Sequence, residues 1–164
     1  MGTSPQAPLP YNAHINSSYS YTLLSVVSTF FTGAFLGMRV GAFRKAAKVP
    51  YPYEYASYEQ VTTAAPAQAK LLDNFNRAQR GHQNFNENIA LVVGAILITG
   101  ITYPTAAPVL GFTWSVNRII YALGYTNGAE GGKGRYYGAA GMIAQYVLFI
   151  MSAMSAWKIA NVNA

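Results

Sequence analysis

The chain has 164 residues, of which 52% are apolar and only 10% are charged. A soluble domain usually carries about a quarter of its residues as charged side chains, so this composition predicts a small integral membrane protein. The absence of cysteine excludes a disulfide framework, a thiolate metal site and a protein thiol nucleophile, and we expect no metal. The formal charge of +6 does not indicate nucleic-acid binding, because the basic residues lie beside apolar runs.

The N-terminal part of the chain predicts a tail followed by one membrane domain. Residues 1 to 18 contain prolines but no Lys or Arg, and we expect a retained, flexible tail. Residues 19 to 164 are expected to form a single four-helix domain. Its first span is predicted over 19–43, because the first charge comes only at Arg39 and about 20 apolar residues cross a membrane. A proline- and tyrosine-rich stretch from Pro50 to Pro66 predicts a long loop at the membrane surface.

A second helix is predicted over 68–103, because a polar run leads into the longest uncharged tract without a turn. Polar side chains recur there at i, i+3, i+7 and i+10 and form a polar stripe that consists of Arg77, Arg80, Asn84 and Glu87. Asp73 lies on the same face of the helix. Such a stripe is costly near hydrocarbon unless its members pair with one another or with a polar ligand. Internal ion pairs from Asp73 to Arg77 and from Arg80 to Glu87 explain the stripe as well as a ligand does.

The third and fourth spans follow an uncharged turn that contains Pro104 and Pro108. The third is predicted over 105–125, with Arg118, Tyr121 and Tyr125 on one face near its end. Taken alone, these tyrosines are more typical of an aromatic belt at the membrane surface than of a binding site.

The glycine-rich segment 126–135 predicts a flexible basic turn. It is not a phosphate-binding P-loop, because neither a preceding strand nor the Lys-Ser/Thr pair of that motif is present. An uncharged run then predicts the fourth span over 135–158.

Charge asymmetry predicts the orientation. Eight of the eleven Lys and Arg residues lie within 44–80 and 126–135, so both stretches are expected in the cytosol and both termini on the opposite side. Basic and phenolic side chains from all four helices then share one membrane depth. This convergence predicts a common pocket between helices.

Three motifs occur in order on three of the expected helices. They are Val40-Gly41 with Arg44-Lys45 and Lys48-Val49-Pro50-Tyr51-Pro52; Phe75-Asn76 with Gln79-Arg80, His82-Gln83-Asn84 and Glu87; and Arg118, Tyr121 and Gly124-Tyr125. With these motifs, residues 40–157 resemble the MAPEG family of membrane-associated proteins in eicosanoid and glutathione metabolism. The resemblance is greatest to its microsomal glutathione transferase type 3 branch.

The resemblance implies an all-α, four-transmembrane-helix bundle that forms a homotrimer and binds glutathione at a cytosol-facing site between subunits. The glutathione-binding side chains that it implies are Arg80, Gln83, Asn84, Glu87, Arg118, Tyr121, Tyr125 and Lys133. Arg135 is the implied arginine beside the thiol, with Lys133 as its alternative, and Arg44 is implied to reach the site from the first helix. Two departures are that Ala90 and Leu91 stand where the family usually has a proline, and that Asn88 replaces a tyrosine of the leukotriene-C synthase branch.

The implied function is a membrane-bound glutathione transferase or peroxidase, with leukotriene-C synthase-like activity as a variant. It would stabilise the glutathione thiolate with arginine, and conjugate it to a lipophilic electrophile or reduce a lipid hydroperoxide, among membrane lipids. The residues suit this ligand, because guanidinium groups bind carboxylates bidentately and Glu87 can receive an ammonium group. The resemblance favours the endoplasmic reticulum membrane, with the mitochondrial outer membrane as alternative. A non-catalytic lipid-binding scaffold of this fold and a structural subunit of a membrane assembly remain open.

Overall fold

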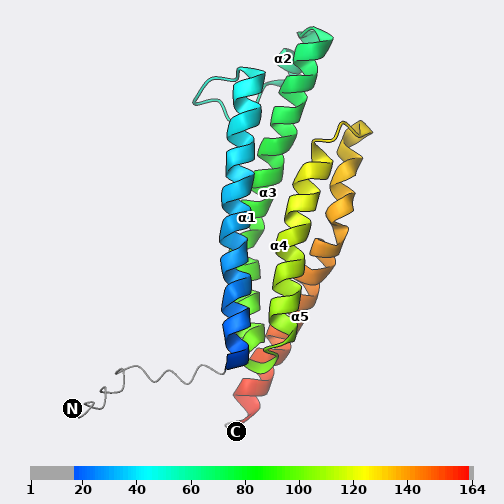
Figure 1. The fold of residues 1–164 in the computed structure, drawn as a ribbon. Helices are drawn as coiled ribbons and strands as arrows, with labels where there is room; N and C mark the ends of the chain where they lie inside the picture. Colours follow the sequence, from blue (N-terminus) through cyan, green and yellow to red (C-terminus); the bar gives the residue numbers. More distant parts are fainter. Residues whose placement is uncertain (1–16, 163–164) are drawn as a thin grey trace, which may run out of the picture.

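The computed structural model describes residues 17–162, and its regular elements are helices. The elements are α1 (Ser17–Ala47), α2 (Tyr58–Thr63), α3 (Pro66–Thr102), α4 (Ala106–Tyr125), the 3-10 segment η1 (Glu130–Gly138) and α5 (Ala139–Val162). Both α1 and α5 pack against α3 and α4. Figure 1 shows an elongated bundle in which α1 begins and α5 ends at the same end. The expected tail, residues 1 to 18, falls almost wholly outside the described residues.

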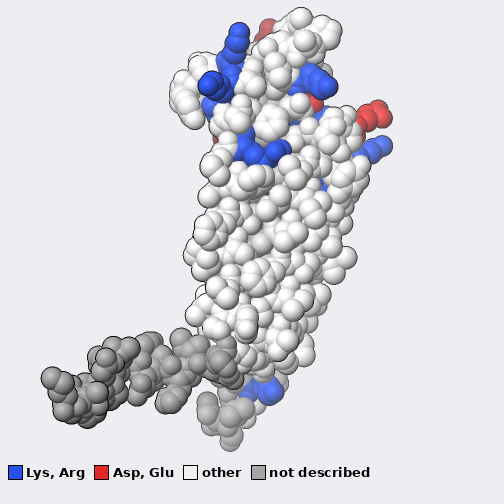
Figure 2. Space-filling model, viewed as in Figure 1, with Lys and Arg blue, Asp and Glu red and all other residues white. Residues whose placement is uncertain are grey.

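Within residues 17–162, three helical segments are long and apolar enough to cross a membrane: Ser18–Ala47, Pro66–Thr102 and Glu130–Asn161. They support the expectation of a membrane protein. The predicted span over 105–125 is not among them. Its helix, α4, has 20 residues, but Asn117 and Arg118 lower its hydropathy. Figure 2 shows most of the visible charged atoms gathered at the end of the molecule that carries α2, and a broad uncharged face between them and a smaller basic group at the other end.

Helix α3 is continuous from the polar run into the apolar tract, as the sequence predicts. At 1.5 Å per residue its 37 residues extend about 55 Å, well beyond a hydrocarbon layer of about 30 Å. Figure 1 shows α2 and the adjoining ends of α1 and α3 reaching past the tips of α4 and η1. The polar stripe on α3 therefore lies where the helix leaves the apolar part of the bundle.

The core between the helices combines large apolar residues with close helix contacts. Phe85 of α3 and Trp114 of α4 are fully buried, with ring centroids 5.3 Å apart. Buried hydroxyl residues of α1 face this core, and Ser28 donates a hydrogen bond of 2.9 Å to Ser115 on α4. At Gly100 of α3, an added Cβ would lie 2.5 Å from Thr22 Cγ2 of α1. The approach of α1 to α3 therefore depends on a missing side chain.

Two connections differ from their predictions. The expected loop between Pro50 and Pro66 contains the short helix α2, which begins with a capping box. Ser57 Oγ accepts from the Gln60 backbone N–H at 3.1 Å, and Gln60 Oε1 accepts from the Ser57 backbone N–H at 2.8 Å. This pair supplies the first-turn hydrogen bonds that a short helix otherwise lacks.

The glycine-rich segment forms η1 rather than a simple turn, so the α-helix α5 begins at Ala139 and not at the predicted residue 135. Gly131 and Gly132 adopt positive φ values of 58° and 67°. A Cβ at Gly132 would lie 2.4 Å from Tyr125 Cε2, so its backbone packs directly against that ring. Glycine is required here for both its left-handed conformation and its size.

Replacing Gly100 with Ala tests the close contact between α1 and α3. We expect Gly100→Ala to lower the free energy of unfolding by about 1–3 kcal/mol, because the buried Thr22 side chain must move. Gly94→Ala is the matched control on the same helix, because its Cβ meets no atom within 4 Å. It should be neutral or stabilise by up to about 1 kcal/mol through helix propensity. Thermal unfolding in detergent measures both, and equal effects of the two variants would contradict the packing argument.

Candidate functional site

Side chains from α3, α4 and η1 meet at the end of the bundle where α4 finishes. Arg118 Nη2 donates to Asn84 Oδ1 at 2.7 Å, and Asn84 Nδ2 lies 3.4 Å from Glu87 Oε2. Glu87 Oε1 in turn accepts from Arg80 Nη1 at 2.6 Å. Four of the predicted residues therefore form one hydrogen-bonded chain across two helices.

The ion pairs of residues 17–162 are the two that the sequence suggested. Arg80 pairs with Glu87, and Arg77 pairs with Asp73 at 2.8 Å. Arg77 also donates to the Ala129 carbonyl at 2.9 Å, which ties α3 to the segment before η1. The side chains of Arg80 and Glu87 are about half exposed, so their attraction is weakened by solvent. The polar stripe alone is thus satisfied without a ligand.

Arg118 is different, because its guanidinium group is buried without a carboxylate partner. The residue is 5% exposed, and its Nε has no hydrogen-bond partner. The group lies over the rings of Tyr121 and Trp114, at 4.6 and 5.8 Å from their centroids. Since a buried charge is costly unless paired, this arginine is poised for an anionic group.

Two cavities flank this hydrogen-bonded chain. The first, which we call the Arg118 cavity, has a volume of about 310 Å³, and its lining includes Asn84, Arg118, Tyr121 and Arg135. The second, which we call the Arg80 cavity, has a volume of about 390 Å³, and its lining includes Tyr55, Arg77, Arg80 and Tyr125. The Tyr121 and Tyr125 rings, with centroids 5.6 Å apart, belong one to each cavity. Both volumes are typical of small-molecule sites.

The η1 segment brings Arg135 to the Arg118 cavity. Arg135 Nη1 donates to the carbonyls of Gly131 and Gly132 at 3.2 and 3.4 Å, and Nη2 donates to the Tyr136 hydroxyl at 2.9 Å. These contacts fold the side chain back over its own segment and hold it at the cavity. Lys133 is exposed and lines neither cavity.

Gln83, a predicted ligand residue, is engaged by the connection between α1 and α2. It accepts from the Tyr55 hydroxyl and donates to the Glu54 carboxylate. Burial first, and the neighbouring Glu54 second, raise the pKa of Tyr55, so its hydroxyl stays protonated and can donate at neutral pH. Asn76 of α3 clamps the same connection by donating to the Ala56 carbonyl and accepting from the Ala56 N–H, both at 2.9 Å. Gln83 thus holds Tyr55 in place at the Arg80 cavity.

Arg44 lies outside both cavities and is 9% exposed. Its Nη1 donates to the Tyr53 carbonyl at 2.6 Å, and its guanidinium lies between the Tyr51 and Phe75 rings, 4.5 and 4.7 Å from their centroids. The resemblance implies a role for Arg44 in the ligand site, whereas its contacts within the chain organise the connection between α1 and α2.

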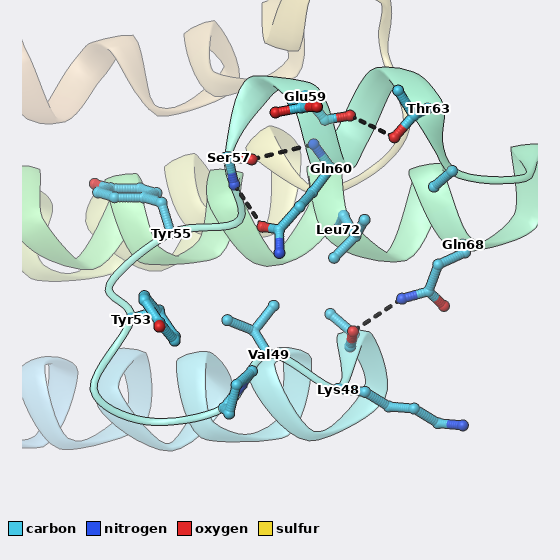
Figure 3. A pocket seen from close by; sticks show the side chains of 13 residues that line it. Lys48, Val49, Tyr53, Tyr55, Ser57, Glu59, Gln60, Thr63, Gln68 and Leu72 are labelled. Carbon is cyan, nitrogen blue, oxygen red and sulfur yellow. Dashed lines mark hydrogen bonds between the residues drawn. The ribbon is translucent and has the colours of Figure 1, made fainter.

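Another cavity, of about 730 Å³, lies under that connection and does not coincide with the predicted site (Figure 3). Its lining has one basic and one acidic side chain, Lys48 and Glu59, both exposed. Figure 3 shows Lys48 directed away from the cavity, while Tyr53 and Val49 approach it from the connection. It therefore lacks the gathered cations that an anionic ligand with two carboxylates requires. Tyr55 is the residue that it shares with the Arg80 cavity.

Among the lining residues of the Arg118 cavity that the sequence analysis did not predict are two amides, Asn88 of α3 and Gln145 of α5. Gln145 Nε2 donates to Asn88 Oδ1 at 2.7 Å, and Gln145 Oε1 accepts from the Trp114 indole N–H at 3.0 Å. A signal was available, because Gln145 is an amide within an otherwise apolar stretch, where a polar side chain usually has a function.

These features define a helical membrane-protein bundle with arginine- and tyrosine-lined cavities at one end. A model of the MAPEG family matches residues 22–154, and the chain belongs to this family. The family includes glutathione transferases, peroxidases and leukotriene synthases, and its members commonly use glutathione.

Replacing Arg44 separates its two possible roles. We expect Arg44→Ala to expose the connection between α1 and α2 to proteases, because the Tyr53 carbonyl and the Tyr51 and Phe75 rings lose their partner. Glutathione affinity, measured by calorimetry, should change less than about threefold. Lys45→Ala, at the exposed neighbouring position, is the control and should alter neither property. A large loss of glutathione affinity with unchanged proteolysis would assign Arg44 to the ligand site instead.

Proposed function

We propose that this protein is a membrane-bound glutathione transferase, with glutathione-dependent peroxidase activity from the same thiolate. The observation that carries the proposal is the buried guanidinium of Arg118, which has no carboxylate partner and borders a cavity shared with Arg135. Internal pairing explains the stripe on α3, but the charge of Arg118 has no carboxylate within ion-pair distance among residues 17–162. A carboxylate of glutathione would compensate it.

The side chains around the two cavities match glutathione group by group. The ligand carries two carboxylates, for which Arg118 and Arg80 are the proposed partners, and an ammonium group, for which Glu87 is the proposed partner. Asn84 already contacts both Arg118 and Glu87, so it would hold them in position for the ligand. Tyr121 and Tyr125, whose rings meet edge to face, would border the peptide, one from each cavity. Gln83 would act through Tyr55, and Lys133 would add positive charge at the entrance.

Arg135 is the proposed activator of the thiol. A free thiol has a pKa of about 8.5 and is mostly protonated at neutral pH, whereas the thiolate is the nucleophile. A guanidinium that lowers this pKa by about two units contributes about 2.7 kcal/mol to ionisation. Arg135 suits this role, because it borders the cavity and meets backbone carbonyls and a hydroxyl rather than a carboxylate.

The second substrate would be a lipophilic electrophile or a lipid hydroperoxide, since such molecules partition into the surrounding bilayer. The exposed apolar side chains of α1 and α5 support contact with lipid and with neighbouring subunits of the proposed homotrimer. The charged end of the molecule and the positive-inside rule support a cytosol-facing site (Figure 2). The endoplasmic reticulum and the type 3 branch are proposed through resemblance to the family.

Calorimetry and turnover on detergent-solubilised protein test the function. We expect glutathione to bind and chlorodinitrobenzene to be conjugated. Binding of lipid without binding of glutathione would indicate a non-catalytic scaffold. Binding of neither would leave a structural subunit.

Replacing Arg118 tests whether its buried guanidinium group binds the ligand. We expect Arg118→Met to weaken glutathione binding at least tenfold while leaving thermal stability unchanged or raised, because a buried unpaired charge is removed. Arg39→Met is the matched control, since Arg39 is half-buried, lines neither cavity and donates to Thr126 at 2.8 Å. It should lower stability and spare binding. A destabilised Arg118→Met variant with normal affinity would make Arg118 a structural residue.

Replacing Arg135 tests thiol activation. We expect Arg135→Ala to bind glutathione with nearly normal affinity but to shift the thiolate absorbance midpoint from about pH 6.5 towards about 8.5. Activity at neutral pH should fall in proportion to the thiolate fraction. Lys133→Ala is the control and should leave the midpoint unchanged. Unaltered thiolate absorbance in Arg135→Ala together with a shift in Lys133→Ala would exchange the two roles.

A further inference from the structure

The lining of the Arg118 cavity includes a pair of amides whose orientation is fixed by an indole. The Trp114 side chain is fully buried, and an indole N–H can only donate a hydrogen bond. It donates to Gln145 at 3.0 Å, so the oxygen of the Gln145 amide must face Trp114. The nitrogen of that amide then faces Asn88 at 2.7 Å, and it must meet the Asn88 oxygen.

The Asn88 amide is fixed in the same way. With its oxygen directed to Gln145, its nitrogen donates to the Asn84 backbone carbonyl at 2.7 Å. The orientation of two side-chain amides is usually ambiguous, but here the donor-only indole determines both. Each amide nitrogen carries two hydrogens, and these bonds use one on each. Asn88 and Gln145 line the cavity, and each keeps one amide N–H that these bonds do not use.

The remaining polar chemistry of the cavity points the same way. Arg118 and Arg135 both line the cavity and bring two guanidinium groups to it. No Asp or Glu belongs to the lining. The α5 side of the cavity is formed partly by Met142 and Tyr146, which are exposed on the apolar surface of the bundle. A molecule arriving from lipid would meet a wall of donors near Gln145.

We propose that the Asn88 and Gln145 amides form a subsite that binds a hydrogen-bond-accepting oxygen of the lipophilic second substrate, such as the carbonyl oxygen of a conjugated ketone or aldehyde. This inference rests on the proposed glutathione transferase function. In the addition to such a substrate, the thiolate sulfur bonds to the β-carbon and the electron pair moves to the carbonyl oxygen, giving an enolate. The α-carbon then takes a proton from water. Donors placed at that oxygen stabilise the charge that develops on it.

Comparing two electrophiles shows whether the amides act on a carbonyl oxygen or affect activity in general. Benzylideneacetone carries a conjugated carbonyl, whereas benzyl chloride has no oxygen and loses chloride when sulfur attacks its carbon. We expect Gln145→Leu and Asn88→Leu to lower kcat/KM for benzylideneacetone about tenfold, and for benzyl chloride less than twofold. Met142→Leu is the control, because it changes the same cavity without removing a donor. Equal losses for both electrophiles, or no loss for either, would overturn the proposal.

Glutathione affinity is measured for the same variants. It should stay within twofold of the unsubstituted protein. A larger loss would show that the amides hold the tripeptide, and would overturn the oxygen subsite while leaving the transferase function in place. Absence of glutathione binding in the unsubstituted protein would instead contradict the proposed function.

A binding measurement tests the subsite without turnover. The chain has two tryptophans, and Trp157→Phe leaves Trp114 as the fluorescent reporter beside Gln145. We expect the unreactive ketone benzylacetone to change Trp114 emission at concentrations at least fivefold below those of butylbenzene. Gln145→Leu should abolish that difference. Equal responses to the two compounds before substitution would overturn the proposal.

A folding control accompanies Gln145→Leu, because that change leaves the buried Trp114 N–H without an acceptor. The double variant Gln145→Leu with Trp114→Phe removes this donor as well. We expect it to show the same selective loss with benzylideneacetone. Normal activity of the double variant with both electrophiles would overturn the subsite.

Discussion

The burial of the Arg118 guanidinium against Asn84 is the constraint on which the site depends. A hydrogen bond of 2.7 Å from Arg118 to Asn84 joins α4 to the polar stripe on α3. The Trp114 and Tyr121 rings beneath it exclude water without neutralising its charge. A charge in that setting costs free energy until an anion arrives, so the same interaction both orders the helices and prepares a ligand site.

The connection between α1 and α2 supplies the second half of the site. Asn76 holds the backbone of Ala56, and Arg44 holds the carbonyl of Tyr53, so that Tyr55 faces the Arg80 cavity. This order is local to the part of the molecule that extends beyond α4. Because polar backbone groups outside hydrocarbon can also bind water, a long connection is tolerated there and can be shaped for binding.

Charged side chains of α3 form ion pairs with one another, whereas Arg118 of α4 and Arg135 of η1 form none among residues 17–162. The charged residues of the stripe on α3 form two ion pairs, as expected if the stripe binds no ligand. The case for a ligand therefore rests on α4, where a buried arginine lacks a carboxylate, and on η1, where glycines bring Arg135 to the same cavity. The MAPEG family match covers residues 22–154, which include both of these elements.

The sequence by itself determined the membrane character, the continuous helix α3 and its two ion pairs, because hydropathy and helical spacing are local properties. Three spaced motifs also indicated four residues that line the cavities: Arg80, Arg118, Tyr121 and Tyr125. Only the tertiary structure decided which partners they take. Arg44 bonds to the connection between α1 and α2, Gln83 bonds to Tyr55, and Gln145 bonds to Asn88. No short-range sequence pattern predicts these partners, because they lie far apart in the sequence or depend on the path of the backbone.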